Sequence, residues 1–207
     1  MNLFDISHEV NTPISSSASF DWGLWHANRH QAAGVASLYV VEVASNRKDI
    51  LAAQQLRFEV FRAEYGASFS SNAAGIDQDE FDHFCDHLIV RERCSRRVVG
   101  TYRMLLPAQA KRLGRYYSQG EFFMTRIERM IPGLLEIGRS CVHPDHRNGA
   151  VIMMLWSGIV RYLLDHGCTH LIGCASVSMR DGGVRAATLW DRFQGNLMVD
   201  SMLEAFP

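Results

Sequence analysis

The sequence predicts an α/β fold in which a mixed sheet is flanked by helices. Segments typical of strands and helices follow one another in the order strand, helix, three strands, helix, strand. The chain has 207 residues, of which 47% are hydrophobic and 21% charged, and this composition is typical of a globular domain. We therefore divide the chain into a polar N-terminal arm, residues 1–35, and one folded domain, residues 36–207.

Charge, hydropathy and cysteine content exclude several classes of protein. The formal net charge is −1, so the positive field of a general nucleic-acid binder is absent and we expect no nucleic-acid partner. The longest apolar run, residues 150–156, is too short to cross a bilayer. Residues 1–18 lack the features of a secretory signal, and the five cysteines contain no Cys-x-x-Cys pair. We therefore expect a cytoplasmic protein with reduced thiols.

The folded domain is predicted to begin with a strand and a helix. Residues 37–44 are rich in β-branched and aromatic side chains, which favours a strand. Asn46 can cap the next helix, in which apolar residues recur at helical spacing as far as Tyr65. The small residues of segment 66–75 then predict a loop.

A hairpin and a less regular segment follow. Residues 88–91 and 97–106 are predicted to be strands, and the short polar turn between them indicates an antiparallel hairpin. Pro107–Leu113 is predicted to be a short helix. Residues 116–132 are ambiguous between loop and helix.

The last predicted elements are a strand, a helix and a strand. Leu134–Val142 is predicted to be a strand, which ends at the turn around Pro144. Residues 149–166 are predicted to be a helix because apolar residues recur along one face. Gly167 ends that helix, and residues 169–177 are predicted to form the next strand.

The turn before this last helix is the most informative feature of the sequence. A glycine-containing turn that opens a helix exposes backbone N–H groups and the positive end of the helix dipole, and both favour an anion. We therefore expect a phosphate group to approach Arg147, Gly149, Ala150 and Val151. A glycine near the start of a helix is more often explained by ordinary turn chemistry, so the pattern alone does not establish an anion site.

This strand, turn and helix resemble the acyl-donor motif of the GNAT N-acyltransferase fold, in which the turn holds the phosphate side of a pantetheine arm. Further matches narrow the resemblance to the acyl-homoserine-lactone synthases, which use an acyl carrier protein as acyl donor. In order and spacing, the matches are Arg57-x-x-x-Phe61, Asp79-x-x-Asp82, Gly100-Thr-Tyr-Arg103 and Glu136-x-x-Arg139.

Segments 136–156 and 171–176 are more similar still to the ornithine N-acyltransferases. Those enzymes move a 3-hydroxyacyl chain from acyl carrier protein to the α-amine of ornithine, giving the lyso-ornithine lipid. The resemblance covers roughly residues 38–177 and implies a mainly antiparallel sheet. It departs at the C-terminal part, which is shorter than usual in the family. It implies no cofactor besides the carrier's pantetheine arm, and we expect no metal.

Glu136 is the predicted general base. An amine must lose a proton before it attacks a thioester, so a carboxylate or a water-linked base is needed near the donor carbon. The alternative role of Glu136 is a structural ion pair with Arg139 or Arg103. The resemblance implies that the backbone N–H near Val142 is the oxyanion donor, so Val142 belongs to both the catalytic and the donor-binding predictions.

The predicted substrate site consists of charged residues: Arg57, Asp79, Asp82, Arg103 and Arg139. The two aspartates either hold the cationic amino acid or tie their loop to Arg57 or Arg103. Because an unpaired buried arginine is costly, the strand positions of Arg103 and Arg139 favour internal pairing.

Three other groups of residues are weaker candidates. His83 and His87 lie four apart beside acidic residues, but no second pair of zinc ligands accompanies them. Cys141 and Cys174 occupy apolar strand contexts, which favours buried, unreactive thiols over a covalent acyl-enzyme. Two arginines that follow the last predicted strand, with Arg147, are candidates for docking an acidic carrier protein: Arg180 and Arg185.

The preferred prediction is an acyl carrier protein-dependent amino acid N-acyltransferase with ornithine as acceptor. A single-chain lipid product would bring the enzyme into transient contact with the inner membrane face. Three alternatives remain: an acyl-homoserine-lactone synthase, which needs S-adenosylmethionine; a synthase of other N-acyl amino acids; and a non-catalytic acyl-chain binding module.

Overall fold

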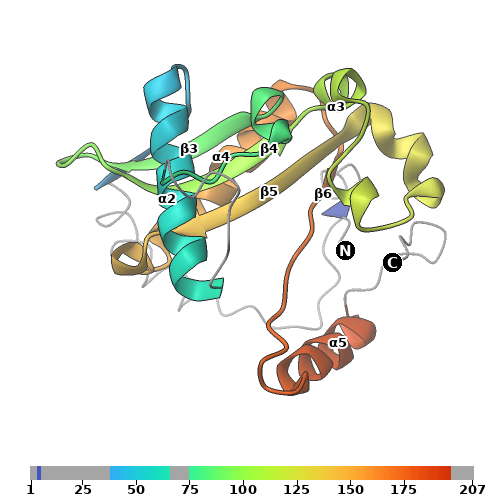
Figure 1. Ribbon diagram of the computed structural model, residues 1–207. Helices are drawn as coiled ribbons and strands as arrows, with labels where there is room; N and C mark the ends of the chain where they lie inside the picture. Colours follow the sequence, from blue (N-terminus) through green and yellow to red (C-terminus); the bar gives the residue numbers. More distant parts are fainter. Residues whose placement is uncertain (1–3, 6–37, 66–74, 197–207) are drawn as a thin grey trace, which may run out of the picture.

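The computed structural model describes residues 4–5, 38–65 and 75–196, which form a six-stranded sheet with helices (Figure 1). The strands are β1 (Phe4–Asp5), β2 (Tyr39–Val43), β3 (Asp86–Glu92), β4 (Val98–Leu105), β5 (Leu134–Val142) and β6 (His170–Ile172). The α-helices are α2 (Arg47–Tyr65), α3 (Pro107–Leu113), α4 (Ala150–Asp165) and α5 (Val184–Asn196). Short 3-10 helices are η2 (Glu80–His83), η3 (Ser118–Gly120), η4 (Thr125–Gly133) and η5 (Pro144–His146).

The strands lie side by side in the order β1-β6-β5-β4-β3-β2. Neighbouring strands are antiparallel except β5 and β6, which are parallel. α2 crosses one face of the sheet and α4 covers the other (Figure 1). The predicted fold class, a mixed and mainly antiparallel sheet flanked by helices, is confirmed.

The two faces of the sheet carry separate hydrophobic clusters because successive side chains of a strand point to opposite faces. Along β3, Leu88 and Val90 belong to the cluster that α4 covers with Leu155. Ile89, between them, belongs to the cluster that α2 covers. The two helices therefore hold the middle of the sheet from both sides.

β5 and β6 pair over a short distance and then diverge. Residues 134–136 pair with residues 170–172. Gly173 follows, and a Cβ atom at this position would lie 2.7 Å from the carbonyl oxygen of Ile137. Glycine is therefore required for the close approach of the two backbones at the point where they separate.

β5 also carries a bulge. Thr101 and Arg103 of β4 lie opposite Cys141 and Gly138, so two residues of β5 occupy the space opposite one residue of β4. One of the two, Arg139, has a φ of 51°, in the left-handed region that is uncommon for residues other than glycine. Bulges of this kind re-aim side chains and are frequent beside functional sites.

Most predicted elements are confirmed with small shifts at their ends, but the last predicted strand is too long. β6 covers only His170–Ile172, and residues 173–177 are not part of a strand because the chain separates from β5 after Ile172. The ambiguous segment 116–132 contains the 3-10 helices η3 and η4. Of the predicted arm, Phe4–Asp5 pairs with β6; the rest of the arm and most of loop 66–75 lie outside the described residues.

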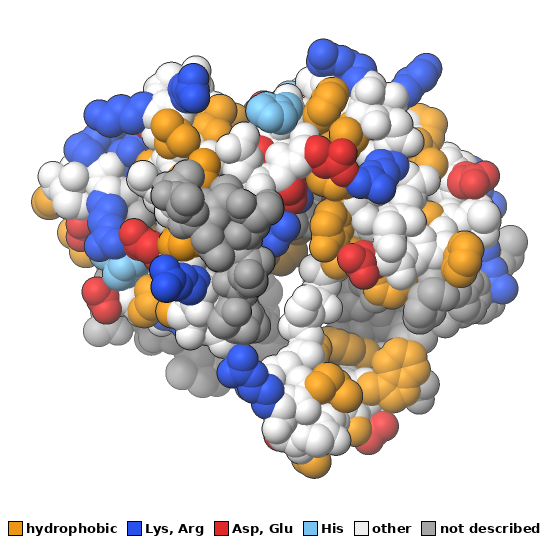
Figure 2. Space-filling model, in the orientation of Figure 1, with side chains coloured by type: hydrophobic (Ala, Val, Ile, Leu, Met, Phe, Trp, Pro, Cys, Tyr) orange, Lys and Arg blue, Asp and Glu red, His pale blue; other side chains and the backbone are white. Residues whose placement is uncertain are grey.

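α5 was not predicted from the sequence. Figure 1 shows it apart from the sheet, after the extended segment that follows β6, and Figure 2 shows hydrophobic side chains on its surface. Val184 and Trp190 are among its exposed residues. Among the helices that the structure describes, none has the length and apolar character needed to cross a membrane.

Candidate active site

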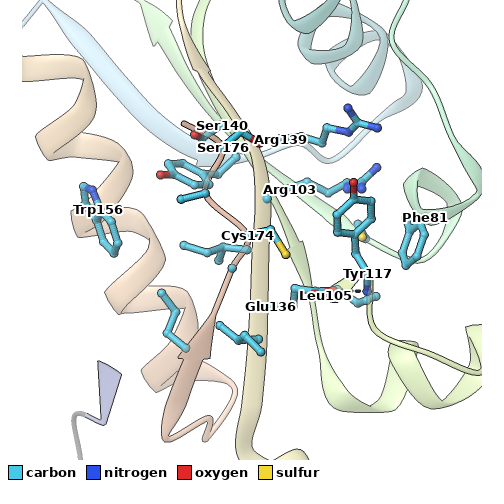
Figure 3. Close-up of a pocket in the computed structure, with 18 of the residues that line it drawn as sticks. Phe81, Arg103, Leu105, Tyr117, Glu136, Arg139, Ser140, Trp156, Cys174 and Ser176 are labelled. Atoms are coloured by element: carbon cyan, nitrogen blue, oxygen red, sulfur yellow. Dashed lines mark hydrogen bonds between the residues drawn. The ribbon is translucent and has the colours of Figure 1, made fainter. Parts of the chain in front are cut away.

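A cavity of about 680 Å³ lies where β5 and β6 diverge (Figure 3). Its volume falls within the range of small-molecule binding sites in proteins. The bulge contributes to its wall, because five successive residues of β5 line it: Glu136, Ile137, Gly138, Arg139 and Ser140. Segment 171–176 forms the opposite wall.

The cavity has two chemically different arms, one on each face of the sheet. The apolar arm, on the face covered by α4, is lined by Tyr102, Ile137, Trp156 and Leu171. The polar arm, on the opposite face, is lined by Phe81, Arg103, Tyr117, Glu136 and Arg139. Figure 3 shows Trp156 on one side of β5 and the two arginines on the other. The cavity can therefore hold a molecule with a hydrocarbon end and a charged end.

Glu136 is buried at the base of the polar arm and is held by segment 117–118. Its Oε1 atom accepts hydrogen bonds from the Ser118 backbone N–H (2.8 Å) and hydroxyl (2.5 Å). Its Oε2 atom accepts one from the Tyr117 N–H (2.7 Å). Neither Arg103 nor Arg139 is paired with Glu136 in the described part of the chain, so the alternative of a structural ion pair with them is wrong.

The predicted charged residues form one buried ion-pair network. Arg57 pairs with Asp82 (2.7 Å) and with Asp77 (2.9 Å), a member that sequence analysis missed. Arg103 pairs with Asp79 (2.6 Å) and with Asp82 (3.3 Å). The structure therefore shows the internal pairing expected of Arg103, and it shows the two aspartates tying η2 to the sheet.

Arg139 joins the same network through Asp79, at 3.1 Å. Burial alone would raise the pKa of Asp79, but Arg103 and Arg139 outweigh burial and hold that pKa below its usual value of 3.8. Asp79 also caps η2 by accepting a hydrogen bond from the Phe81 N–H at 2.9 Å. The Asp79 carboxylate therefore fixes two arginines and one turn at once.

Only part of the predicted substrate site lines the cavity. Arg103 and Arg139 do, whereas Arg57, Asp79 and Asp82 lie behind them in the network. The Arg103 side chain is 5% exposed and that of Arg139 is 30% exposed. Arg139 is therefore the arginine whose guanidinium group is better placed to meet a ligand.

A second cavity, of about 370 Å³, lies where the end of β5 meets the start of α4. Val142, Arg147 and Gly149 line it, so the structure brings these predicted donor residues together. Phe61 and Ser140 line both cavities, and the two are therefore adjacent.

Backbone geometry at this junction has two features relevant to an anion. His143 N–H donates to the Val99 carbonyl, and since N–H directions alternate along an antiparallel strand, the Val142 N–H points away from β4. Gly149, with a φ of 85°, is the N-cap of α4. Ala150 N–H is capped by the Asn148 side chain at 3.1 Å, and the Val151 side chain is buried in the core.

The Arg147 side chain already has partners inside the protein. It pairs with Glu64 of α2 and donates from Nε to the Val142 carbonyl at 3.1 Å. Glu64 was missed because no motif links it to Arg147, which lies 83 positions later. A phosphate at this site would compete with Glu64 for the guanidinium group.

Metal and thiol chemistry have little support in the described residues. They contain no group of three or more histidines, cysteines and acidic residues that could hold a metal ion. Cys141 is buried, and burial raises the pKa of its thiol to about 12. Cys174 is half-buried beside the Ser118 hydroxyl, at 3.4 Å, and burial raises its pKa as well. Both thiols are therefore protonated at neutral pH.

Residues 56–157 match the family model of the acetyltransferase (GNAT) domain. Curated relatives named L-ornithine N(alpha)-acyltransferase include those of Rhodobacter capsulatus and Brucella abortus, both 39% identical over 145 residues. These matches cover 67% and 66% of this chain, and 56% and 52% of the relatives. A third, from Agrobacterium fabrum, is 36% identical over 176 residues, which are 81% of this chain and 57% of the relative. The chain thus spans about half the length of the curated relatives it matches.

The fold is similar to that of the CoA-dependent acyl-homoserine lactone synthase BjaI. In two structures of that enzyme, the aligned residues cover 72% of this chain and 72% of the BjaI chain. The TM-scores are 0.51 and 0.50, at 20% and 22% sequence identity. At this level of identity the similarity concerns the fold alone.

Proposed function

We propose that the chain is a GNAT acyltransferase, since residues 56–157 match the model of that domain, and that it transfers a fatty acyl chain to the α-amine of an amino acid, with L-ornithine preferred. The names of its relatives support the acceptor. The observation that carries the reaction class is the cavity with one apolar and one arginine-lined arm, adjacent to the cavity at the start of α4.

The proposed donor is a 3-hydroxyacyl chain on acyl carrier protein, with the carrier's pantetheine arm as the only group that acts as a cofactor. The thioester would lie near the Val142 N–H, which points away from β4 toward the divergence of β5 and β6. The phosphate of the arm would lie against the N-terminus of α4, where Gly149 leaves space and the helix dipole favours an anion.

The transfer itself needs a base and an oxyanion donor. The amine nitrogen attacks the thioester carbon, the Val142 N–H stabilises the negative charge on the oxygen, and the carbon–sulfur bond then breaks. The amine loses a proton to Glu136 or to water bound to it, and the departing pantetheine sulfur takes up a proton. A carboxylate offers about four acceptor positions and Glu136 uses three of them, so one position on Oε2 remains for this proton.

The acceptor would bind in the polar arm. Arg139, which is partly exposed there, would pair with the carboxylate of the amino acid, and Arg103 would support it electrostatically. Glu136, which lines the same arm, would counter the charge of the ammonium groups of ornithine.

One experiment tests the proposal. The purified protein is incubated with 3-hydroxyacyl carrier protein and an equimolar mixture of amino acids, and the acylated product is identified by mass spectrometry. Acyl-ornithine supports the proposal, and a different acyl-amino acid overturns the choice of acceptor. A parallel reaction with S-adenosylmethionine tests for an acyl-homoserine lactone, and tight acyl binding without turnover would identify a binding module.

Contact with the inner membrane face is part of the same proposal, because an acylated ornithine is a single-chain lipid. The test is flotation of the protein with vesicles, with and without product in the bilayer. Equal recovery of the protein in the lipid-free fraction in both cases would contradict it.

A further inference from the structure

A glutamate outside the predicted site lies one turn of 3-10 helix beyond Ser118. Glu121 ends η3, and its backbone N–H donates to the Ser118 carbonyl at 3.1 Å. In a 3-10 helix, side chains three positions apart lie on the same face, about 6 Å apart along the axis. The Ser118 side chain is buried against Glu136 and Cys174. Glu121, which is exposed, therefore lies on the cavity side of η3 and closer to solvent.

Two residues that line the polar arm are within electrostatic reach of Glu121. Burial and the Glu121 carboxylate raise the pKa of the Tyr117 phenol, and Arg139 opposes them. Burial also raises the pKa of the Cys174 thiol, and the carboxylates of Glu136 and Glu121 both add to this effect. Because Tyr117 and Cys174 line the polar arm, the Glu121 carboxylate lies at the mouth of that arm.

The carboxylate of Glu121 is available to a cation. The two arginines of the polar arm, Arg103 and Arg139, pair with Asp79, at 2.6 and 3.1 Å. Within the described ranges of the chain, no arginine, lysine or histidine forms an ion pair with Glu121. The polar arm therefore has a carboxylate at its base, Glu136, guanidinium groups on one wall and a second carboxylate at its mouth.

We propose that Glu121 binds the distal ammonium group of a diamino acid acceptor and thereby selects L-ornithine over neutral amino acids. The inference rests on the proposed function, because it takes the ligand of the polar arm to be the acceptor. In an extended ornithine molecule the two nitrogen atoms lie roughly 6 Å apart. This length matches the single turn between Ser118, which holds Glu136, and Glu121. An ornithine whose α-amine lies at Glu136 can therefore reach Glu121 with its distal ammonium group.

Three substitutions separate the charge of Glu121 from its reach. Glu121→Gln removes the charge and keeps the size of the side chain, whereas Glu121→Asp keeps the charge and withdraws it by one methylene group. Because Glu121 is exposed, neither substitution disturbs the core. Glu128→Gln is the matched control, since Glu128 is an exposed glutamate of the nearby η4 whose charge does not act on Tyr117 or Cys174.

The experiment is a competition between two acceptors for one 3-hydroxyacyl carrier protein donor. L-norvaline has the carbon skeleton of ornithine but lacks the distal amine, and the two amino acids are supplied at equal concentration. The ratio of acyl-ornithine to acyl-norvaline, measured by mass spectrometry, reports the ratio of their kcat/KM values. Effects on donor binding cancel in this ratio, because both products come from the same donor.

We expect the wild-type protein and Glu128→Gln to prefer ornithine equally. Glu121→Gln should lower the ratio of ornithine to norvaline product by roughly fivefold, the upper end of what an exposed ion pair contributes. Salt should lower the ratio for the wild-type protein but not for Glu121→Gln, because screening weakens only the charge interaction. A purely structural role of Glu121 would not produce this difference.

Lysine, which is longer than ornithine by one methylene group, tests the reach of the carboxylate. The ratio of lysine to ornithine product should rise in Glu121→Asp, because a longer substrate compensates for the withdrawn carboxylate. The same ratio in Glu121→Asp and the wild-type protein would contradict direct pairing.

The outcomes separate the inference from the proposed function. An active Glu121→Gln variant that keeps the wild-type preference for ornithine overturns the inference and leaves the acyl transfer intact. A wild-type protein that transfers acyl chains to both amino acids without preference also overturns it. If the wild-type protein acylates no amino acid with any donor, the proposed function is wrong, and the inference is wrong with it because the polar arm then binds no acceptor.

Discussion

Glu136 has two roles that a single substitution affects together. The carboxylate is the candidate base, and it also holds segment 117–118 through hydrogen bonds to both of its oxygens. In Glu136→Gln, an amide NH2 group replaces one of the two carboxylate oxygens. This NH2 group cannot accept the hydrogen bond that the segment donates at that position, so two donors would face each other. We expect a loss of about 1–3 kcal/mol of unfolding free energy from this mismatch. If Glu136 is the base, kcat should fall in addition by roughly 10²–10⁴.

Ser118→Ala separates the two roles. It removes the hydroxyl donor but leaves the carboxylate and the backbone N–H groups in place. We expect it to lower the thermal midpoint while kcat falls much less than in Glu136→Gln. Equal reductions of kcat in the two variants, measured at saturating substrate, would show that Glu136 acts only by holding the segment.

His87 should make the stability of the protein depend on pH. It is buried with Nε2 3.6 Å from Asp82, and burial together with Arg57 lowers its pKa below 6.5. The unfolded chain therefore takes up this proton at a higher pH than the folded protein. Below about pH 6.5 the unfolded state binds more protons, so the free energy of unfolding decreases as the pH falls.

In His87→Gln the glutamine side chain does not titrate, so this variant takes up no proton at position 87 when it unfolds. Its free energy of unfolding, measured by denaturant titration, should vary less than that of the wild-type protein between about pH 6.5 and pH 4.5. Asp79 does not disturb this comparison, since its pKa lies below 3.8. Parallel pH curves for the two proteins would show that His87 is not kept neutral by its surroundings.

At the scale of the elements, the cavity exists because β5 and β6 diverge. Gly173 is the first residue after β6 and lies where the two strands separate. Because a Cβ atom there would lie 2.7 Å from the Ile137 carbonyl oxygen, Gly173→Ala forces the two backbones apart. We expect a loss of about 1–3 kcal/mol of unfolding free energy. Gly120→Ala is the control, because nothing lies within 4 Å of a Cβ atom at that position. Equal thermal midpoints for the two variants would contradict the close approach.

Sequence patterns predicted the elements that are defined locally. α4 was found because its apolar residues recur at helical spacing, and the β3–β4 hairpin because a short polar turn separates two apolar segments. β6 was predicted too long because composition shows strand propensity but not the loss of the partner strand after Ile172. The 3-10 helices of segment 116–132 lack a period that marks them clearly.

Sequence analysis identified only those residues of the candidate site that belong to a recognisable motif. Arg103 and Arg139 were found through motif spacing, and both line the cavity. Ser118 and Asp77 were missed because their contacts with Glu136 and Arg57 join segments that are distant in sequence, without any recurrent pattern. The two-armed shape of the cavity follows from the separation of two strands, which is a property of the assembled sheet.

At the scale of the whole molecule, recognition of an acidic carrier protein needs local positive charge, because the formal net charge is −1. Figure 2 shows cationic and anionic side chains interspersed over the visible face. At the mouth of the second cavity, Arg147 is 46% exposed and pairs with Glu64. The other predicted docking residues, Arg180 and Arg185, are exposed around the start of α5.

If these arginines bind the carrier, the efficiency of transfer should depend on salt. We expect kcat/KM for acyl carrier protein to fall steeply from low to physiological ionic strength, because salt screens charges between two protein surfaces. An acyl-pantetheine donor carries little charge and should be nearly insensitive. Arg147→Ala should raise the KM for the carrier more than the KM for the amine, and it should flatten the salt dependence. The same salt dependence for both donors would mean that the enzyme recognises only the pantetheine arm, because the arm is the one feature the two donors share.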